Sequence, residues 1–465
     1  MYKLKKKVLG DKTIQTKKVV PVIKKKKKQV FQAIRGMKDI LPGDQPYWEQ
    51  IRRVSEKLAR DYGFLRLNTP ILEQADLFIR NIGAGTDIVE KEMYVFTTRG
   101  KDRVALRPEL TAGNCRSFIQ NGMQILSKPV KIFSVGNVYR YDRPQEGRQR
   151  EHFQINFDAF GEKDPVLDAQ VIQVAGRMLQ CLGIKSFQIQ VNSIGCPVCR
   201  KEYLQLLSAY WNSKKSKLCY DCKKRMKNNP LRVFDCKEDK CFQATTSAPQ
   251  TVDHLCDDCR KHFKFLLEYL DELELPYAIN SRLVRGLDYY TKTVFEIWSG
   301  GEEMQGKMSL GGGGRYDELI KFMGGEDTPA VGFAMGAERL VLEMKKVQAK
   351  PYKSLQPKIF LAQLGNLAKK KSLRLLSELE KNGILVAESF GRGGLKSQLR
   401  MANKRKVKFT LILGQKEALD GSIIIKDMET GVQETVNAQK LVDIIKKRIK
   451  SENVVIYKNG LNNNK

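Results

Sequence analysis

Three arginines stand inside apolar stretches of this sequence, where a positive charge is costly unless an anion pairs with it. Arg140 lies in "NVYRYD", Arg285 in "LVRGLDYY" and Arg339 in "GAERL". A surface ion pair is the simpler explanation for any one of them, but the three together favour a cavity lined by guanidinium groups. Because guanidinium matches phosphate oxygens in a bidentate way, such a cavity suits a triphosphate.

Acidic and amide side chains occur in the same strand-like settings. Glu109 follows "ALRP", and Gln154 and Asp158 lie in "REHFQINFDAFG". A carboxylate in apolar surroundings needs a cation or hydrogen-bond donors. These side chains suit the ammonium group of a substrate that binds beside the phosphates.

The charge balance points to a polyanionic partner. The 465 residues include 83 Lys and Arg against 52 Asp and Glu, a formal charge of +31. Twelve lysines and one acidic residue fall in the first thirty positions, which predicts a basic, disordered tail over 1–30. Nucleic acid is the polyanion that this charge favours, although a lysine-rich proteome would explain it equally well. The sequence has no apolar run long enough to span a bilayer and no secretory signal, so we expect a cytoplasmic protein.

The elements that must position these side chains follow from hydrophobic periodicity. Residues 43–64 predict a helix with Pro46 near its start and Gly63 at its end. Strand-like runs follow one another closely from 64 to 161, which indicates a mainly antiparallel sheet. Beyond a proline-containing linker, strands and helices alternate, as is typical of a small α/β domain with a partly parallel sheet.

Cysteines mark a small insertion at about 195–275. Eight of the ten cysteines lie there, and six of those form three C-x-x-C pairs. This spacing is typical of structural zinc sites in a cytoplasmic chain, where disulfides are disfavoured. Ordinary buried or surface thiols are the alternative. The ligand set that we predict for one zinc ion is Cys219, Cys222, Cys256 and Cys259.

Several motifs together resemble the histidyl-tRNA synthetase family of class II aminoacyl-tRNA synthetases. They are "RGMKDILP", "VEKEMYVF", "LRPELTAG", "YRYDRPQEGRQREHFQ", "LVRGLDYYT", "GGGGRYD" and "AVGFAMGAERL". The resemblance covers residues 31–450 in family order. It implies an α+β fold with an antiparallel six-stranded sheet flanked by helices, a small helical insertion and a C-terminal α/β anticodon-binding domain.

The resemblance also implies a reaction and roles for the matched residues. L-Histidine would be attached to its tRNA through a histidyl-adenylate, with ATP as a substrate, Mg²⁺ as a cofactor, and AMP and pyrophosphate as products. Arg285 and Arg140 would contact the α-phosphate, and Arg339 the γ-phosphate, as the catalytic residues. His152 stands where the family has an adenine-stacking phenylalanine, so it would bind ATP. The residues that would hold histidine are Glu109, Thr111, Gln154, Asp158, Tyr289, Tyr290 and Tyr316.

The same resemblance assigns partners and boundaries. Contacts to the acceptor end of histidine tRNA would come from Arg143, Gln145, Arg148 and Arg150. The segment "RLNTPILE" matches the motif that forms a homodimer interface. The implied boundaries are a catalytic domain at 31–345, a linker at 346–356, an anticodon-binding domain at 357–451 and a tail at 452–465. The alternative function is a catalytically inactive, synthetase-like regulatory protein that binds histidine or tRNA.

Overall fold

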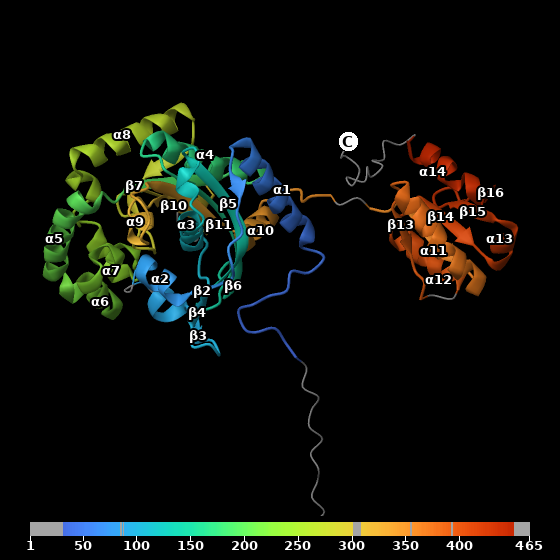
Figure 1. The fold of residues 1–465 in the computed structure, drawn as a ribbon, viewed down its shortest axis with the longest axis horizontal. Coiled ribbons are helices and arrows are strands. Elements are labelled where there is room, and N and C mark those ends of the chain that lie inside the picture. Colours follow the sequence, from blue (N-terminus) through green and yellow to red (C-terminus); the bar gives the residue numbers. More distant parts are fainter. Residues whose placement is uncertain are drawn as a thin grey trace, which may run out of the picture. The chain divides into compact units, whose positions relative to one another are not determined.

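The computed structural model describes residues 31–83, 86, 88–300, 308–353, 356–391 and 394–450. The predicted tails at 1–30 and 452–465 therefore lie outside the described residues. The chain divides into two compact units, Met1–Tyr352 and Lys353–Lys465, and Figure 1 shows both. The division falls inside the segment 346–356.

The first unit is built on an eight-stranded sheet, in the order β1-β5-β6-β11-β10-β9-β7-β8. The six central strands pair in an antiparallel way, as predicted. The two outer strands, β1 and β8, add parallel pairs to β5 and β7. The strand bounds, in sheet order, are Leu65–Arg66, Val130–Tyr139, Glu151–Phe160, Ala330–Gly336, Ser309–Arg315, Thr291–Ser299, Phe187–Ser193 and Tyr277–Ile279.

One face of this sheet is covered by helices, and the other face keeps open space. Helices α1 (Gln45–Asp61), α4 (Pro165–Cys181), α8 (Asp257–Glu272) and α10 (Ala337–Lys346) pack on the first face through one large apolar cluster. Helices α3 (Thr111–Gln120) and α9 (Leu319–Phe322) pack on the opposite face. Side chains alternate along each strand, so polar residues between the buried apolar ones face this second side.

A small sheet and a helical insertion complete the first unit. The small sheet joins β2 (Leu72–Gln74), β4 (Arg103–Leu106) and β3 (Tyr94–Thr97), and α2 (Ala75–Ile82) follows β2. The insertion leaves the large sheet after β7. Its elements are α5 (Pro197–Ser213), α6 (Tyr220–Asn228), η4 (Pro230–Asp235), α7 (Asp239–Thr245) and α8. Buried residues that include Tyr203, Leu207 and Trp211 give it a small core of its own.

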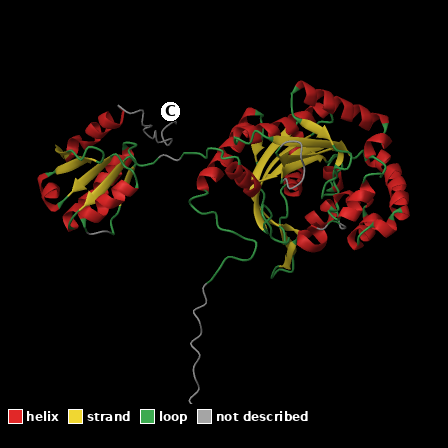
Figure 2. Cartoon of the chain, turned by 180° about the vertical axis from the view of Figure 1, so that it is seen from behind, coloured by secondary structure: helices red, strands yellow, loops and turns green. Residues whose placement is uncertain are grey.

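The second unit is the predicted α/β domain with a partly parallel sheet. Its strand order is β13-β12-β14-β15-β16, with parallel pairs on both sides of β12 and antiparallel pairs beyond β14. Figure 2 shows helices around this sheet. The strands are Val386–Glu388, Ile359–Gln363, Phe409–Leu413, Ser422–Asp427 and Gln433–Asn437, and the helices α11 to α14 are Asn366–Lys381, Leu395–Lys404, Gln415–Asp420 and Leu441–Lys450.

None of the helices in the described part of the chain combines the length and the apolar character that crossing a membrane requires.

Candidate active site

A cavity of about 400 Å³ opens on the second face of the large sheet. Most of the residues predicted from the sequence to bind substrates line it, although they come from positions up to 230 residues apart. The predicted residues on its wall are Glu109, Thr111, Arg140, Arg148, His152, Gln154, Arg285, Tyr289, Tyr290, Tyr316 and Arg339.

Two of the arginines are fixed by backbone carbonyl groups. Arg140 follows β5, and its Nε donates to the carbonyl of Pro108 at 2.8 Å. Arg339 lies in the first turn of α10, where Nε donates to the carbonyl of Gly147 at 2.8 Å and Nη1 donates to that of Ser309 at 2.7 Å. These bonds orient both guanidinium groups and leave further N–H groups on the cavity wall for a ligand.

Arg285 has a different partner, the carboxylate of Glu296 on β9. The distance from its Nη1 to the Glu296 Oε1 is 3.1 Å. Burial works to lower the pKa of Arg285, but Glu296, Tyr290, Asp235 and Tyr289 together outweigh burial and raise it. Gly312 makes room for this arginine, because a Cβ there would lie 2.9 Å from Arg285 Nη1. The glycine-rich strand β10 therefore makes room for the guanidinium group of Arg285.

The arginines on the cavity wall lie close enough to repel one another. Arg148 pairs with Asp142 at 3.1 Å, and Arg285 pairs with Glu296. Burial lowers the pKa of Arg339, and repulsion from Arg148 and Arg140 lowers it further. Mutual repulsion of this kind favours an anion with several charges, such as a polyphosphate.

The other end of the cavity carries acidic and amide groups at the start of α3. Both carboxylate oxygens of Glu109 accept backbone N–H groups, from Thr111 at 2.6 Å and from Ala112 at 2.7 Å. Burial nevertheless raises the pKa of Glu109 to about 7. The Oε1 of Gln154 accepts from the backbone N–H of Leu110 at 3.1 Å, so its Nε2 is the end that can donate to a substrate.

Asp158, which was predicted to suit the substrate ammonium, is not among the residues that line the cavity, although it bonds to two that do. It is fully buried on β6, beneath the cavity floor. It accepts hydrogen bonds from Tyr316 Oη at 2.5 Å and from Asn114 Nδ2 at 2.8 Å. Burial raises its pKa to about 6. Asp158 lies on the same face of β6 as Gln154, and its hydrogen bond from Tyr316 fixes the orientation of that ring.

Three tyrosine rings meet at one side of the cavity, as predicted. The ring centroids of Tyr289 and Tyr290 are 4.7 Å apart, and those of Tyr289 and Tyr316 are 5.6 Å apart. All three are buried. The insertion fixes the backbone next to two of them: Arg200 donates to the carbonyl of Tyr290 at 2.7 Å, and Arg232 donates to the carbonyl of Gly286.

His152 lies on β6 among the arginines. Burial, together with the positive charges of Arg140 and Arg339, lowers its pKa to about 3, so the imidazole is neutral. Its buried Nδ1 has no hydrogen-bond partner among the described residues. A neutral, flat ring on the cavity wall can stack on a base, so an adenine contact of His152 stays a prediction.

The predicted tRNA-contacting residues separate into three environments. They lie on the 140–150 loop between β5 and β6. Arg143 and Gln145 are exposed on this loop. Arg148 lines the cavity, and the guanidinium of Arg150 lies 3.7 Å from the ring of Tyr141. Only the first two thus remain fully available to a large partner.

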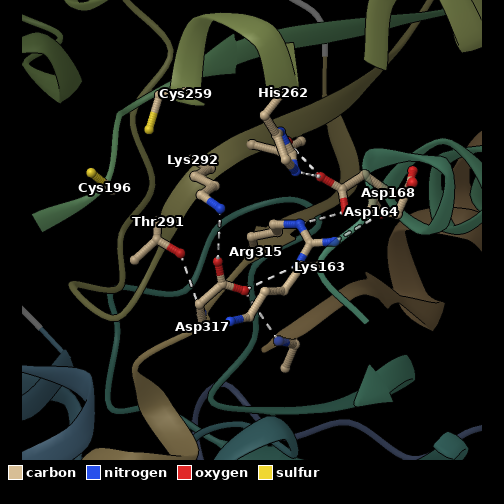
Figure 3. A network of polar contacts seen from close by, with 12 residues as sticks. Lys163, Asp164, Asp168, Cys196, Cys259, His262, Thr291, Lys292, Arg315 and Asp317 are labelled. Atoms are coloured by element: carbon tan, nitrogen blue, oxygen red, sulfur yellow. Dashed lines mark hydrogen bonds and ion pairs between the residues drawn. The ribbon is translucent and has the colours of Figure 1, made fainter. Parts of the chain in front are cut away.

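A buried ion network beneath the site was not predicted. Arg315 at the end of β10 is fully buried and pairs with Asp168 of α4 at 2.7 Å and with Asp317 at 3.1 Å. Figure 3 shows this arginine between the two carboxylates, with Lys292 and His262 at the edges. Burial lowers the pKa of His262 to about 3, so it adds no charge. The network anchors β10 and therefore the neighbouring Tyr316.

The predicted zinc ligands Cys219, Cys222, Cys256 and Cys259 do not form one group. The first pair begins α6 and the second begins α8, and each pair lies with other cysteines. This prediction was wrong because C-x-x-C spacing identifies a pair of ligands, while the partner of each pair is decided by the tertiary fold.

Sequence reasoning also missed acidic and basic residues on the cavity wall, namely Glu296, Glu338 and Arg232. Glu296 interrupts the apolar strand "TVFEIW", which is the signal that singled out Arg285. Glu338 accepts the backbone N–H of Phe153 through both oxygens, at 3.0 and 3.1 Å. Arg232 lies in the insertion, and the sequence gives no sign that it reaches the catalytic sheet.

This chain is similar to known proteins in sequence and in fold. Residues 36–197 and 237–340 match the family model for histidyl-tRNA synthetase, and 358–448 match an anticodon binding domain. A histidine–tRNA ligase of Dehalococcoides mccartyi is 45% identical over 90% of this chain and 100% of that protein. One of Desulforamulus reducens is 40% identical over 89% and 98%. The apo histidyl-tRNA synthetase of S. aureus matches with a TM-score of 0.75 at 31% identity, over 90% of this chain and 100% of that one.

Proposed function

The chain belongs to the histidyl-tRNA synthetase family and attaches histidine to its tRNA, and from this premise we propose that its cavity forms histidyl-adenylate from L-histidine and ATP. The observation that carries the proposal is the convergence of Arg140, Arg285 and Arg339 on one cavity, with Glu109 and Gln154 at its other end. The arginine end of the cavity suits a polyphosphate, and the acidic end suits an amino acid, so the two substrates would lie side by side.

The chemistry is an in-line displacement at phosphorus. The carboxylate of histidine attacks the α-phosphorus of ATP, and the bond to the pyrophosphate leaving group breaks. The nucleophile is already anionic, so the step needs no general base, and catalysis rests on positioning and charge stabilisation. Arg140 and Arg285 hold the α-phosphate, and Arg339 holds the γ-phosphate. The terminal hydroxyl of the tRNA then attacks the activated carbonyl, and AMP leaves.

Histidine is selected at the acidic end of the cavity. Glu109 and Thr111 receive the ammonium group, and Gln154 Nε2 donates to the carboxylate. Tyr289, Tyr290 and Tyr316 enclose the imidazole. A site that hydrogen-bonds its substrate rejects analogues that lack the matching groups by large factors.

Mg²⁺ is the metal that this reaction would use. Glu296 and Glu338 place carboxylate oxygens on the cavity wall, which is the ligand type that Mg²⁺ takes together with substrate phosphates. The ion would neutralise phosphate charge when it is bound.

We place the protein in the cytoplasm, as a homodimer that binds tRNA through Arg143, Gln145 and the second unit. Large apolar side chains stay exposed on and beside β1 and β2, which supports a subunit interface there: Leu65 is 64% exposed, and Ile71 and Leu72 are each 46% exposed.

Sedimentation equilibrium should give twice the chain mass. The variant Leu72→Glu should weaken the dimer, whereas Leu419→Glu, at an exposed leucine of the second unit, should not. A monomeric wild-type chain would overturn the homodimer.

The decisive experiment for the site is ATP–pyrophosphate exchange with each of the twenty amino acids. We expect exchange with L-histidine alone. Histidine or tRNA binding without exchange would favour the alternative, a synthetase-like regulatory protein without catalytic activity.

A further inference from the structure

Eight cysteines of the insertion form two groups of four that the reaction does not use. The first group is Cys196, Cys199, Cys256 and Cys259. The second group is Cys219, Cys222, Cys236 and Cys241. The four sulfur atoms within each group all lie within 4.8 Å of one another. We propose that each group binds one structural Zn²⁺ ion, so that one chain carries two tetrathiolate zinc sites.

The sulfur–sulfur distances fit a tetrahedral metal site. A Zn–S bond of about 2.3 Å sets the edge of a regular tetrahedron at about 3.8 Å. A disulfide would require about 2.05 Å, and all eight thiols are free. The Sγ–Sγ distances are 3.7 Å for Cys196–Cys199, 3.8 Å for Cys196–Cys256, 3.9 Å for Cys199–Cys259 and 3.8 Å for Cys219–Cys236.

The backbone around the cysteines favours thiolates. Cys196, Cys219 and Cys256 are the N-caps of α5, α6 and α8, where the helix dipole and unpaired N–H groups favour negative charge. The backbone N–H of Cys222 donates to Cys219 Sγ at 3.4 Å, and that of Cys219 donates to Cys241 Sγ at 3.1 Å. Each group therefore supplies a formed ligand shell.

Each group closes a different part of the insertion. The first group joins the start of α5 to the start of α8, which are about sixty residues apart along the chain. In Figure 3 its members Cys196 and Cys259 lie beside the buried network that includes Lys292. The second group joins α6 to the segment of η4 and α7. A module with so small a core gains stability from such cross-links.

Zinc is preferred over iron, the other metal that a tetrahedral set of four thiolates accepts. The general affinity order of divalent ions places Zn²⁺ above Fe²⁺ at a site of this kind. Thiolate ligands also exclude Mg²⁺ and Ca²⁺, which take oxygen ligands.

Both groups adjoin residues that hold the 285–290 segment of the active site. Arg200 follows Cys199 directly and donates to the carbonyl of Tyr290 at 2.7 Å. Asn229 and Arg232 lie between Cys222 and Cys236 in the sequence. Asn229 donates to Asp288 at 2.9 Å, and Arg232 donates to the carbonyl of Gly286. Two bound zinc ions would therefore fix the backbone that carries Arg285 and the tyrosines.

The metal content of the full chain tests the two sites directly. Protein purified under reducing conditions without chelator should contain two zinc ions per chain by elemental analysis. Cys196→Ser and Cys236→Ser should each leave one zinc ion. Cys181→Ser is the matched control, because Cys181 is exposed and outside both groups, and it should keep two. Stoichiometric iron, or less than about one tenth of a zinc ion per chain, overturns the proposal, since each closed site holds one metal.

A measurement on the wild-type chain does not depend on how the variants fold. Titration of the thiols with a mercurial reagent, with a chromogenic zinc indicator present, should release two zinc ions as the eight cysteines react. Eight thiols that react without zinc release would overturn both sites. One zinc ion per chain, lost only in the variants of one group, would overturn the site at the other group.

The consequence for activity rests on the proposed function. Zinc removal should raise the KM for histidine in pyrophosphate exchange about tenfold, on the scale of one lost positioning contact, and should change the KM for ATP less. Two bound zinc ions with an unchanged histidine KM after their removal would overturn the coupling and leave the sites standing. Absence of histidine-dependent exchange in zinc-loaded protein would instead refute the proposed function.

Discussion

Arg285 pairs with Glu296 inside the cavity, so a phosphate that binds this guanidinium shares it with a resident carboxylate. Burial alone would disfavour the charge, and Glu296 together with Tyr290, Asp235 and Tyr289 preserves it. The same carboxylate accepts the hydroxyl of Ser309 at 2.6 Å, which fixes its direction. At the scale of single residues, the site is therefore organised before substrate arrives, which is the condition for strong electrostatic catalysis.

Replacing Arg285 tests this organisation. Arg285→Ala should lower histidine-dependent pyrophosphate exchange by about 10²- to 10³-fold, the range for loss of one preorganised donor. Combining it with Glu296→Gln removes the unpaired carboxylate that the single variant leaves behind, and the loss should persist. Arg282→Ala is the control, because Arg282 packs on the ring of Phe242 at 4.3 Å and does not line the cavity. This variant should catalyse pyrophosphate exchange at the normal rate. Normal exchange by the Arg285 variant would rule out its role.

Glu109 gives the site a pH dependence. Its pKa is about 7, raised by burial from an ordinary value of 4.5, so the carboxylate that we propose binds the ammonium group is largely protonated at pH 6. Glu109→Gln should raise the histidine KM about tenfold at pH 8, on the scale of a charged hydrogen bond, and clearly less at pH 6. Comparison of the two proteins at each pH cancels the titration of the substrate imidazole. An effect that is equal at both pH values would contradict this assignment.

The same pKa has a consequence for stability. Because folded Glu109 binds its proton more tightly than the unfolded chain does, its contribution to stability is full below pH 4.5 and is lost as the pH rises through about 7. The proposed binding of ammonium therefore requires the ionised form of Glu109, whereas the protonated form stabilises the fold more. Such an opposition is common for catalytic groups.

Elements with a clear hydrophobic period could be predicted from the sequence, and short elements could not. Helix α1 begins next to Pro46, and from Phe153 to Asp158 strand β6 alternates apolar and polar side chains, as the sequences indicate. The outer strands β1 and β8 contain two and three residues, too few to show a period. Cysteine partners, like the contact from Arg232 to Gly286, depend on which helices meet in space.

The Arg315 network ties one strand to the helix layer behind it. Arg315 pairs with Asp168 of α4 and donates to the carbonyls of Glu162 and Asp164 at 2.9 and 3.0 Å. Arg315→Leu would leave the buried Asp168 carboxylate without its cationic partner, so it should destabilise the first unit by about 3–5 kcal/mol. Thermal unfolding followed by circular dichroism should show the lower midpoint. Arg177→Leu, an exposed position on α4, should leave the midpoint nearly unchanged, and an equal shift in both variants would argue against the network.

On the scale of the whole molecule, the chain folds into two units, and each unit has its own hydrophobic core. A chain that ends at Tyr352 keeps the stacking of that ring against Arg53 at 4.2 Å and contains every residue of the cavity wall. It should retain histidine-dependent pyrophosphate exchange within about threefold, because adenylate formation uses only this cavity. Charging of histidine tRNA should fall by more than tenfold, since the second unit is lost. Equal loss of both activities would show that the second unit supports the cavity itself.

The sheet order also determines when the cavity can form during synthesis. Strand β6 pairs with β11, and the partners Phe160 and Ala330 are about 170 residues apart. At about 5–20 residues per second, a ribosome needs roughly 10–30 s to make the intervening chain. During that interval β6 presents an unpaired edge, which is a template for wrong pairing. The pocket is thus completed by the last strands of its unit, and the speed of translation between β6 and β11 determines how long the nascent chain stays vulnerable.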